Sequence, residues 1–236
     1  MSDTPRQLYI RARRLFQASR TRDDEKIAFS VFKLSAKGGV AQAHEWLGNL
    51  YDYGVGTRRN LRLAFHHYQL AANAGLANGE YHIGIFYYLG VGVRKNYKKA
   101  VSWLRKAVAQ GDPAASHCLA QCYFYGRGVD RDERRGHRYE VVAASKGEIE
   151  AQFALGVDFS RGRGVRAAPK VAFRWYLRAA RRGHADAAYN LGVMYRQGRG
   201  THVDKKKSEM WFDRAERFTI AEQEAHPDSI RPNHMR

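Results

Sequence analysis

The 236-residue sequence has no long apolar run and contains only two cysteines. No stretch approaches the roughly 18 consecutive apolar residues that a membrane-spanning helix needs. The first residues, MSDTPRQLYIRARRLF, also lack the apolar core of a secretory signal peptide. We therefore expect a cytoplasmic protein with no membrane span. An arginine-rich start with few acidic residues is also found in mitochondrial presequences, and that alternative stays open.

The sequence also lacks the motifs that accompany catalysis. It contains no nucleophile elbow, no phosphate-binding loop and no metallohydrolase helix. The ten histidines are scattered, with His66 and His67 the only adjacent pair, and surface helix positions account for them. We interpret Cys118 and Cys122 as two buried thiols, because a metal site formed with His82 would lack a fourth ligand. We expect no enzymatic activity, no cofactor and no bound metal.

Glycines recur along the chain with a period of 36 residues. The two series are Gly54, Gly90, Gly126, Gly162 and Gly198, and Gly56, Gly92, Gly128, Gly164 and Gly200. An aromatic position repeats in phase with them, at Tyr51, Tyr87, Tyr123, Phe159 and Tyr195. A period of this length predicts a stack of similar supersecondary units.

Each unit reads as two helices joined by a glycine turn. Apolar and small residues recur at three- and four-residue intervals, which predicts one buried stripe per helix. In the first full unit the stripes are Ala43, Leu47, Gly48 and Tyr51, then Ala64, Tyr68, Ala71 and Ala72. Predicted caps for the second helices are Asn60, Asn96, Asp132 and Asp204. With no strand pattern, the fold class is all-α.

The pattern A-x-x-x-L-G-x-x-Y-x-x-G-x-G resembles the Sel-one-like repeat, a relative of the tetratricopeptide repeat. It is clearest in HIGIFYYLGVGVRKNYKKAVSWLRKAVAQG and covers residues 40–218. The resemblance implies a right-handed α-solenoid of about five 36-residue helix-turn-helix repeats that serves as an adaptor or scaffold and is rarely catalytic. Secreted relatives often carry a disulfide in each repeat, which this sequence does not. Ala120, Gly136 and Ala168-Pro169 depart from the pattern and predict softer packing in the third and fourth repeats.

The period also sets the predicted boundaries. Ala28 and Phe32 are in phase with the later repeats, but SRTRDDEK replaces the glycine loop, which is typical of a degenerate terminal unit. We expect a helix extension at the other end and a loose tail from Pro227. The segments are a degenerate N-terminal capping repeat at 1–39, repeats at 40–75, 76–111, 112–147, 148–183 and 184–218, and the C-terminal extension and tail at 219–236.

The chain is strongly basic, with 41 lysines and arginines against 23 aspartates and glutamates, a net charge of +18. One helix position is basic in all six units, and a second basic position lies between the loop glycines of the last three. Equivalent residues of a solenoid stack one repeat apart, so these positions predict basic ridges: Lys26, Arg62, Lys98, Arg134, Lys170 and Lys206, with Arg127, Arg163 and Arg199. The ridges either bind an acidic partner or form a solvated edge.

Three functions remain open. The first is a monomeric adaptor that holds an acidic protein in a groove which, in tetratricopeptide-like folds, is lined by the first helices. Candidate groove residues are Asn49, Asp52, Tyr88, His117, Gln121, Phe124 and Arg196. The second is an immunity or antitoxin-type protein of a bacterial toxin system, a role that some proteins of this family fill. The third, less favoured, is electrostatic binding of nucleic acid, since no base-reading code repeats along the chain.

Overall fold

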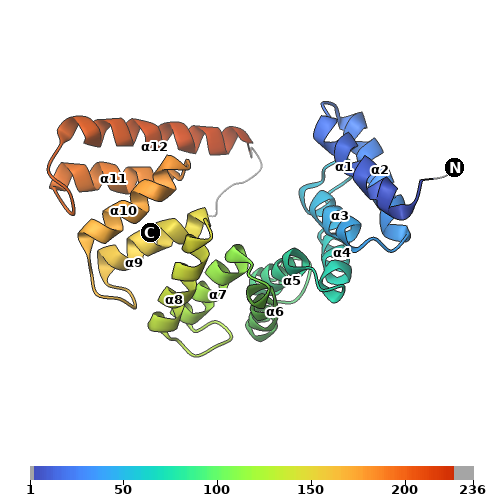
Figure 1. The fold of residues 1–236 in the computed structure, drawn as a ribbon, viewed down its shortest axis with the longest axis horizontal. Helices are drawn as coiled ribbons and strands as arrows, with labels where there is room; N and C mark the ends of the chain where they lie inside the picture. Colours follow the sequence, from blue (N-terminus) through green and yellow to red (C-terminus); the bar gives the residue numbers. More distant parts are fainter. Residues whose placement is uncertain (1–2, 226–236) are drawn as a thin grey trace. The chain divides into compact units, whose positions relative to one another are not determined.

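The computed structural model describes residues 3–225, and within them the chain forms twelve α-helices and no β-strand (Figure 1). The all-α prediction is confirmed. The helices are α1 (Pro5–Ala18), α2 (Arg22–Lys37), α3 (Ala41–Tyr53), α4 (Leu61–Asn73), α5 (Ala77–Leu89), α6 (Tyr97–Ala109), α7 (Pro113–Tyr125), α8 (Glu133–Ser145), α9 (Ile149–Arg161), α10 (Pro169–Arg181), α11 (Ala185–Gln197) and α12 (Lys205–Ala225).

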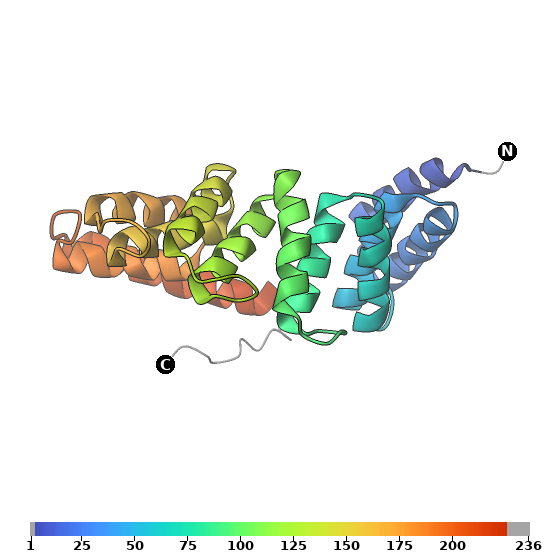
Figure 2. The ribbon, with the colours of Figure 1, turned by 90° about the horizontal axis from the view of Figure 1, so that it is seen from below.

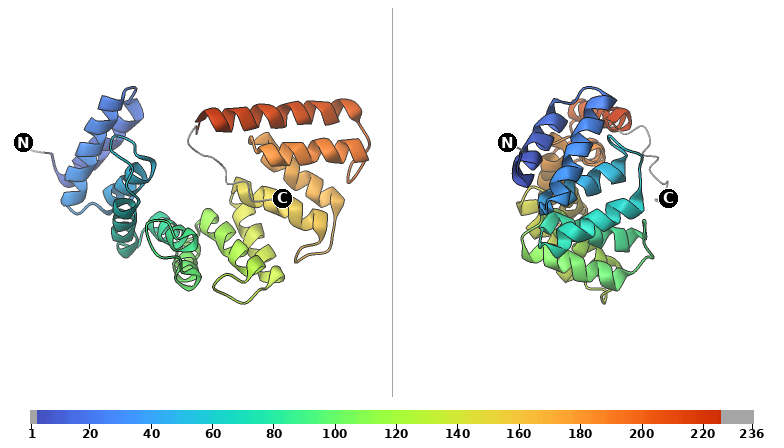
Figure 3. Two further views of the ribbon diagram at one scale, coloured as in Figure 1. Left: turned by 180° about the vertical axis from the view of Figure 1, so that it is seen from behind. Right: turned by 90° about the vertical axis from the view of Figure 1, so that its right-hand side faces the viewer.

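The chain divides into two compact units, Met1–Arg131 with α1 to α7 and Asp132–Arg236 with α8 to α12. Within each unit, every helix packs against the next one along the chain. The most extensive contacts join the two helices of a predicted repeat, as in α3 with α4 and α11 with α12. These pairs can be followed from further directions in Figures 2 and 3. The helix-turn-helix repeat is therefore the packing unit that the sequence predicts.

The loop between α3 and α4 shows why two glycines recur in each repeat. Gly54 ends α3 with a φ of 74°, and its N–H donates to the carbonyl of Leu50. Gly56 approaches the preceding helix so closely that a Cβ atom would lie 2.7 Å from the carbonyl carbon of Glu25. The first glycine supplies a left-handed backbone and the second supplies close approach. Both glycines therefore serve the fold.

The four predicted caps are confirmed. The side chain of Asn60 accepts a hydrogen bond from the N–H of Leu63 at 3.1 Å, and Asn96, Asp132 and Asp204 repeat this contact at α6, α8 and α12. The second helix of the fourth repeat differs, because Ala168 offers no side-chain acceptor there. That helix, α10, instead begins with a proline, which is compatible with the first helical position.

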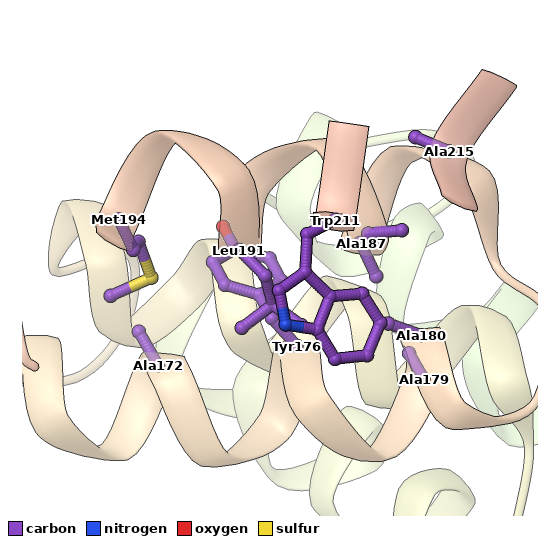
Figure 4. Close-up of a cluster of buried hydrophobic side chains, with 10 residues drawn as sticks. Ala172, Tyr176, Ala179, Ala180, Ala187, Leu191, Met194, Trp211 and Ala215 are labelled. Atoms are coloured by element: carbon purple, nitrogen blue, oxygen red, sulfur yellow. The ribbon is translucent and has the colours of Figure 1, made fainter. Parts of the chain in front are cut away.

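Small residues in the helices make room for large ones across each pair. A Cβ atom on Gly48 would lie 2.5 Å from the ring of Tyr68, and one on Gly156 would lie 2.5 Å from Cε1 of Tyr176. In the core of the second unit, Trp211 lies beside Leu191 among alanines of α10 and α11 (Figure 4). Glycine and alanine therefore let the helices approach closely around a few large side chains.

The two ends of the chain depart from the repeat in different ways. Residues 22–26, predicted to belong to the loop, form the start of α2 instead. The reason is a local capping box, in which Thr21 accepts from the N–H of Asp24 at 3.2 Å and Asp24 accepts from the N–H of Thr21 at 3.0 Å. At the other end α12 continues to Ala225, as predicted. The predicted loose tail from Pro227 lies outside the described residues.

Candidate interaction surfaces

The residues of the first predicted basic ridge are all exposed. Three lie in the first unit and three in the second: Lys26, Arg62, Lys98, Arg134, Lys170 and Lys206. Five of them are the second residue of a helix, whereas Lys26 is the fifth residue of α2, because that helix begins one turn earlier. A cation in the first turn faces the positive end of the helix dipole, which is unfavourable by a few tenths of a kcal/mol.

Among residues 3–225, most of the ridge cations are not neutralised by an ion pair. Lys26 pairs with Asp23, with 2.8 Å between Nζ and Oδ1. Across residues 3–225, the other five cations of the ridge form no ion pair. Each unit therefore presents exposed positive charge at the N-terminal turns of its second helices.

The arginines between the loop glycines contact their own chain. Arg127 donates to the hydroxyl of Tyr88, and its guanidinium group lies 5.3 Å from the ring centroid of Tyr88, 5.8 Å from that of Tyr97 and 5.1 Å from that of Tyr125. Arg199 donates to the carbonyl of Ser160 at 2.7 Å. Both bonds reach back 39 residues, from a loop to the first helix of the preceding repeat. These two arginines therefore link consecutive repeats.

Arg163 belongs to a buried polar cluster between α8 and α9. The carboxylate of Asp158 is fully buried and accepts from Arg163 Nε at 2.8 Å and from His137 Nδ1 at 3.0 Å. The equivalent pair two repeats earlier, Phe65 and Phe86, is apolar, with ring centroids 5.9 Å apart. This cluster was not predicted, although two polar residues at repeat positions that are otherwise mostly apolar are a visible signal of it in the sequence.

The predicted groove residues of α3 are engaged within the first unit. Asn49 accepts from the hydroxyl of Tyr68 at 2.7 Å. Asp52 lies 4.0 Å from Arg59, measured from Oδ1 to Nη2. Burial raises the pKa of Asp52, and the charge of Arg59 counteracts this effect. Both side chains are half-buried and serve contacts between neighbouring elements.

The other groove candidates differ in how much surface they offer. Tyr88 is the partner of Arg127, His117 and Gln121 are half-buried, and Phe124 is 3% exposed. Arg196, in the second unit, is exposed and lies over the ring of Phe212 at 5.4 Å. Arg196 is thus the candidate from this set with the most accessible side chain, and the set is divided between the two units.

Several histidines are interior groups, which corrects the expectation that surface positions account for all of them. His44 and His67 share a hydrogen bond of 2.9 Å between their Nδ1 atoms. Burial, with the neighbouring His44 and His66 adding to it, lowers the pKa of His67 to about 4. His82 stacks on Tyr68 at 4.1 Å between ring centroids, and burial lowers its pKa to about 4. These imidazoles are neutral at pH 7.

The two cysteines differ in how deeply they are buried. Both are free thiols; Cys122 is fully buried and Cys118 only half-buried, so the prediction of two buried thiols holds for one of them. Burial raises the pKa of Cys122 to about 11, which keeps the thiol protonated at neutral pH. Within the described part of the chain, no group of three histidine, cysteine or acidic side chains is placed to hold a metal ion. No described helix is both long enough and apolar enough to cross a membrane.

Comparison with known proteins shows which family and which solved structures share this architecture. The family model described as Sel1 repeat matches residues 41–76, 77–112, 113–147, 149–184 and 185–217. A Sel1 repeat protein from Oxalobacter formigenes has 29% sequence identity, with 90% of this chain and 87% of that one covered and a TM-score of 0.84. A protective antigen with an SLR fold from uropathogenic Escherichia coli has 26% identity and a TM-score of 0.79, with 97% of this chain and 51% of that one covered. No curated protein matches the chain.

A further solved structure is similar over the whole length of this chain. The immunity protein Pa5087 from Pseudomonas aeruginosa has 20% identity and a TM-score of 0.62, with 100% of this chain and 89% of that one covered. At this identity the likeness concerns the fold alone. Five matched repeats take up most of the sequence, in the register of the loop glycines and the capped helix pairs. The chain belongs to the Sel1 repeat family.

Proposed function

We propose that this protein is a non-catalytic scaffold that binds an acidic protein partner through the basic ridge. Sel1 repeat proteins generally mediate protein–protein interactions. The net charge of +18 favours a partner of opposite sign. The proposal takes the protein as a cytoplasmic monomer, a setting that two free thiols fit.

The observation that carries the proposal is the repeated placement of exposed cations that form no ion pair with any of the described residues. Arg62, Lys98, Arg134, Lys170 and Lys206 each occupy a helix position that the dipole disfavours. Exposed charges of one sign raise the association rate with a surface of opposite sign, and this effect weakens as salt screens them. Binding of an acidic surface by the ridge cations of each unit accounts for the repetition.

Charge reversal tests the proposal. The variant Lys98→Glu, Arg134→Glu and Lys170→Glu removes cations from both units while leaving the core intact. At roughly 0.5 kcal/mol per contact, three lost contacts weaken partner capture about tenfold. The matched control reverses three exposed arginines outside the ridge, Arg14, Arg94 and Arg217.

Affinity purification with mass spectrometry, at low and at moderate salt, gives the readout. We expect the ridge variant to lose the proteins that the wild type and the control variant retain, with unchanged helical content by circular dichroism. Equal capture by both variants would contradict the proposal and leave the ridge as a solvated edge.

Nucleic-acid binding is the first alternative, and it has a separate readout. Counterion release would make the affinity for an oligonucleotide fall steeply between about 50 mM and about 200 mM salt. Fluorescence anisotropy with labelled single-stranded and duplex DNA measures this directly. Absence of binding at low salt would eliminate this alternative.

A role as an immunity protein is the second alternative. Two structural neighbours, Pa5087 and PA5088 from Pseudomonas aeruginosa, are immunity proteins with 20% and 21% identity to this chain. At that identity they support a common fold, and the role itself needs a functional test. Rescue of growth when this protein is produced together with a toxin encoded next to it would support the role, and failure to bind such a toxin would count against it.

A further inference from the structure

The outer face of α10 carries a row of cations at four-residue intervals. We name this row the α10 stripe; it consists of Lys170, Arg174, Arg178 and Arg182, and α10 itself contains no acidic residue. Residues four apart lie on one face of a helix, about 6 Å apart along its axis. The stripe therefore follows α10 from its first turn to its C-cap.

The stripe is exposed and keeps its charge. All four side chains are exposed, while the opposite face of α10 packs against α9 and α11. Over residues 3–225, none of the four forms an ion pair. Arg178 lies over the ring of Trp175 at 4.5 Å, and Arg182 donates to the carbonyl of Gly147. These contacts orient two guanidinium groups without neutralising them.

The complete row of four cations occurs only on α10, although α8 and its C-cap carry three of the four, Arg134, Arg138 and Lys146. The corresponding positions are Lys98, Ser102, Lys106 and Gln110 on α6 and its C-cap, and Arg62, His66, Leu70 and Ala74 on α4 and its C-cap. Like charges four residues apart destabilise a helix. The helix dipole favours cations in the last turn and at the C-cap, which covers Arg178 and Arg182 but not Lys170 and Arg174. Stability of α10 alone therefore does not account for the row.

We infer that the α10 stripe is the docking surface for an acidic helix of the partner, with carboxylates at four-residue intervals. This inference rests on the proposed function and names the contact within it. Two helices share a rise of 1.5 Å per residue, so carboxylates spaced in this way match the spacing of the four cations along the helix axis. Each row turns by about 40° around its helix every four residues, so the two rows meet where the helices cross at an angle. Three of the four are arginines, whose planar guanidinium groups bind carboxylates in a bidentate manner.

The surroundings of the stripe favour a helix over a nucleic-acid strand. Binding of single strands without sequence preference relies on aromatic rings that are open to stacking bases. The ring beside the stripe, Trp175, is half-buried and covered by Arg178. The row of cations therefore complements the carboxylates of an acidic helix, whereas the covered ring of Trp175 is not free to stack with a base.

Anisotropy measurements on the full chain test the inference with defined probes. The first probe is a labelled helical peptide with glutamate at every fourth position, and the second has the same composition with the glutamates spread around the helix. A labelled single-stranded DNA is the third. The test variant is Arg174→Glu with Arg178→Glu, and its control is Arg166→Glu with Arg217→Glu, two exposed arginines of the same unit outside the stripe.

We expect the first peptide to bind more tightly than the second, and the test variant to lose about tenfold in affinity while the control loses less than about twofold. Equal binding of the two peptides, equal losses in the two variants, or tighter binding of DNA than of the first peptide would each overturn the inference. The proposed function fails separately, when the ridge variant captures the same cellular proteins as its control. If the peptide experiment failed while the ridge variant still lost its cellular partners, the acidic partner would bind elsewhere on the basic surface.

Discussion

Replacing Asp158 tests how the buried polar cluster stabilises the second unit. The variant Asp158→Met introduces the residue found at this position in the next repeat, Met194. It leaves His137 and Arg163 without their shared acceptor, and removing one partner of a buried pair costs roughly 3–5 kcal/mol. Because the side chain of Arg163 is 23% exposed and can reach water, we expect the lower end of this range, about 3 kcal/mol.

A second substitution separates the ion pair from the packing. The next repeat carries Phe173 and Met194 at the positions of His137 and Asp158, and both belong to one apolar cluster. The double variant His137→Phe with Asp158→Met should recover the part of the loss that comes from His137, while Arg163 still lacks its acceptor, so its stability should lie between those of the single variant and the wild type. Urea unfolding followed by tryptophan fluorescence gives the midpoints, with circular dichroism as a second probe. An unchanged midpoint for the single variant, or a double variant no more stable than the single one, would refute the reasoning.

Three further predictions concern single positions. Gly156→Ala should lower the unfolding midpoint, because the new Cβ would lie 2.5 Å from Cε1 of Tyr176 and overpacking costs about 1–3 kcal/mol, against about 1 kcal/mol gained in helix propensity; a raised midpoint would contradict this. Between pH 6.5 and 4 the unfolded chain binds a proton at His82 that the folded chain does not, so His82 alone should lower the stability by about 2 kcal/mol from pH 7 to pH 5. In urea titrations His82→Phe should remove that share of the pH dependence and leave the share of His67, whose pKa is also about 4; an unchanged slope would contradict this. Gln152→Met should stabilise the protein by about 1 kcal/mol in the same assay, because Gln152 Oε1 is buried without a hydrogen-bond partner; a loss would show that the bond from its Nε2 to Ala144, at 3.3 Å, matters more.

Features set by local sequence were predictable. Asn60 caps α4 because its side chain reaches an N–H three residues later, and a capping residue followed by an apolar stripe shows this in the sequence. The first residue of α2 was misplaced for a similar reason, since Thr21 and Asp24 form a capping box that is out of phase with the 36-residue period. The 36-residue period was therefore enough to locate the repeats, whereas the capping residues determine where each helix begins.

Contacts between repeats were harder to predict. A repeat position places a Cα atom but does not say which way a long side chain turns. Arg127 and Arg163 occupy the same position, yet one lies among tyrosine rings and the other pairs with Asp158. Each outcome depends on residues in neighbouring elements, and Asp158 itself replaces an apolar side chain. The exposure of the ridge residues was easier to predict, because it depends only on which face of each helix is packed against its neighbours.

The cluster around Asp158 has a consequence for how a chain of similar repeats folds correctly. Apolar contacts between repeats resemble one another, so a first helix has several second helices against which it can pack in error. If α9 packed in the wrong register, its fully buried carboxylate would meet phenylalanine or valine, such as Phe173 or Val101, and lose the bond to His137. An unpaired buried charge costs several kcal/mol, more than a misplaced methyl group. Asp158 thereby disfavours packing of α9 against any second helix other than α8, which supplies His137.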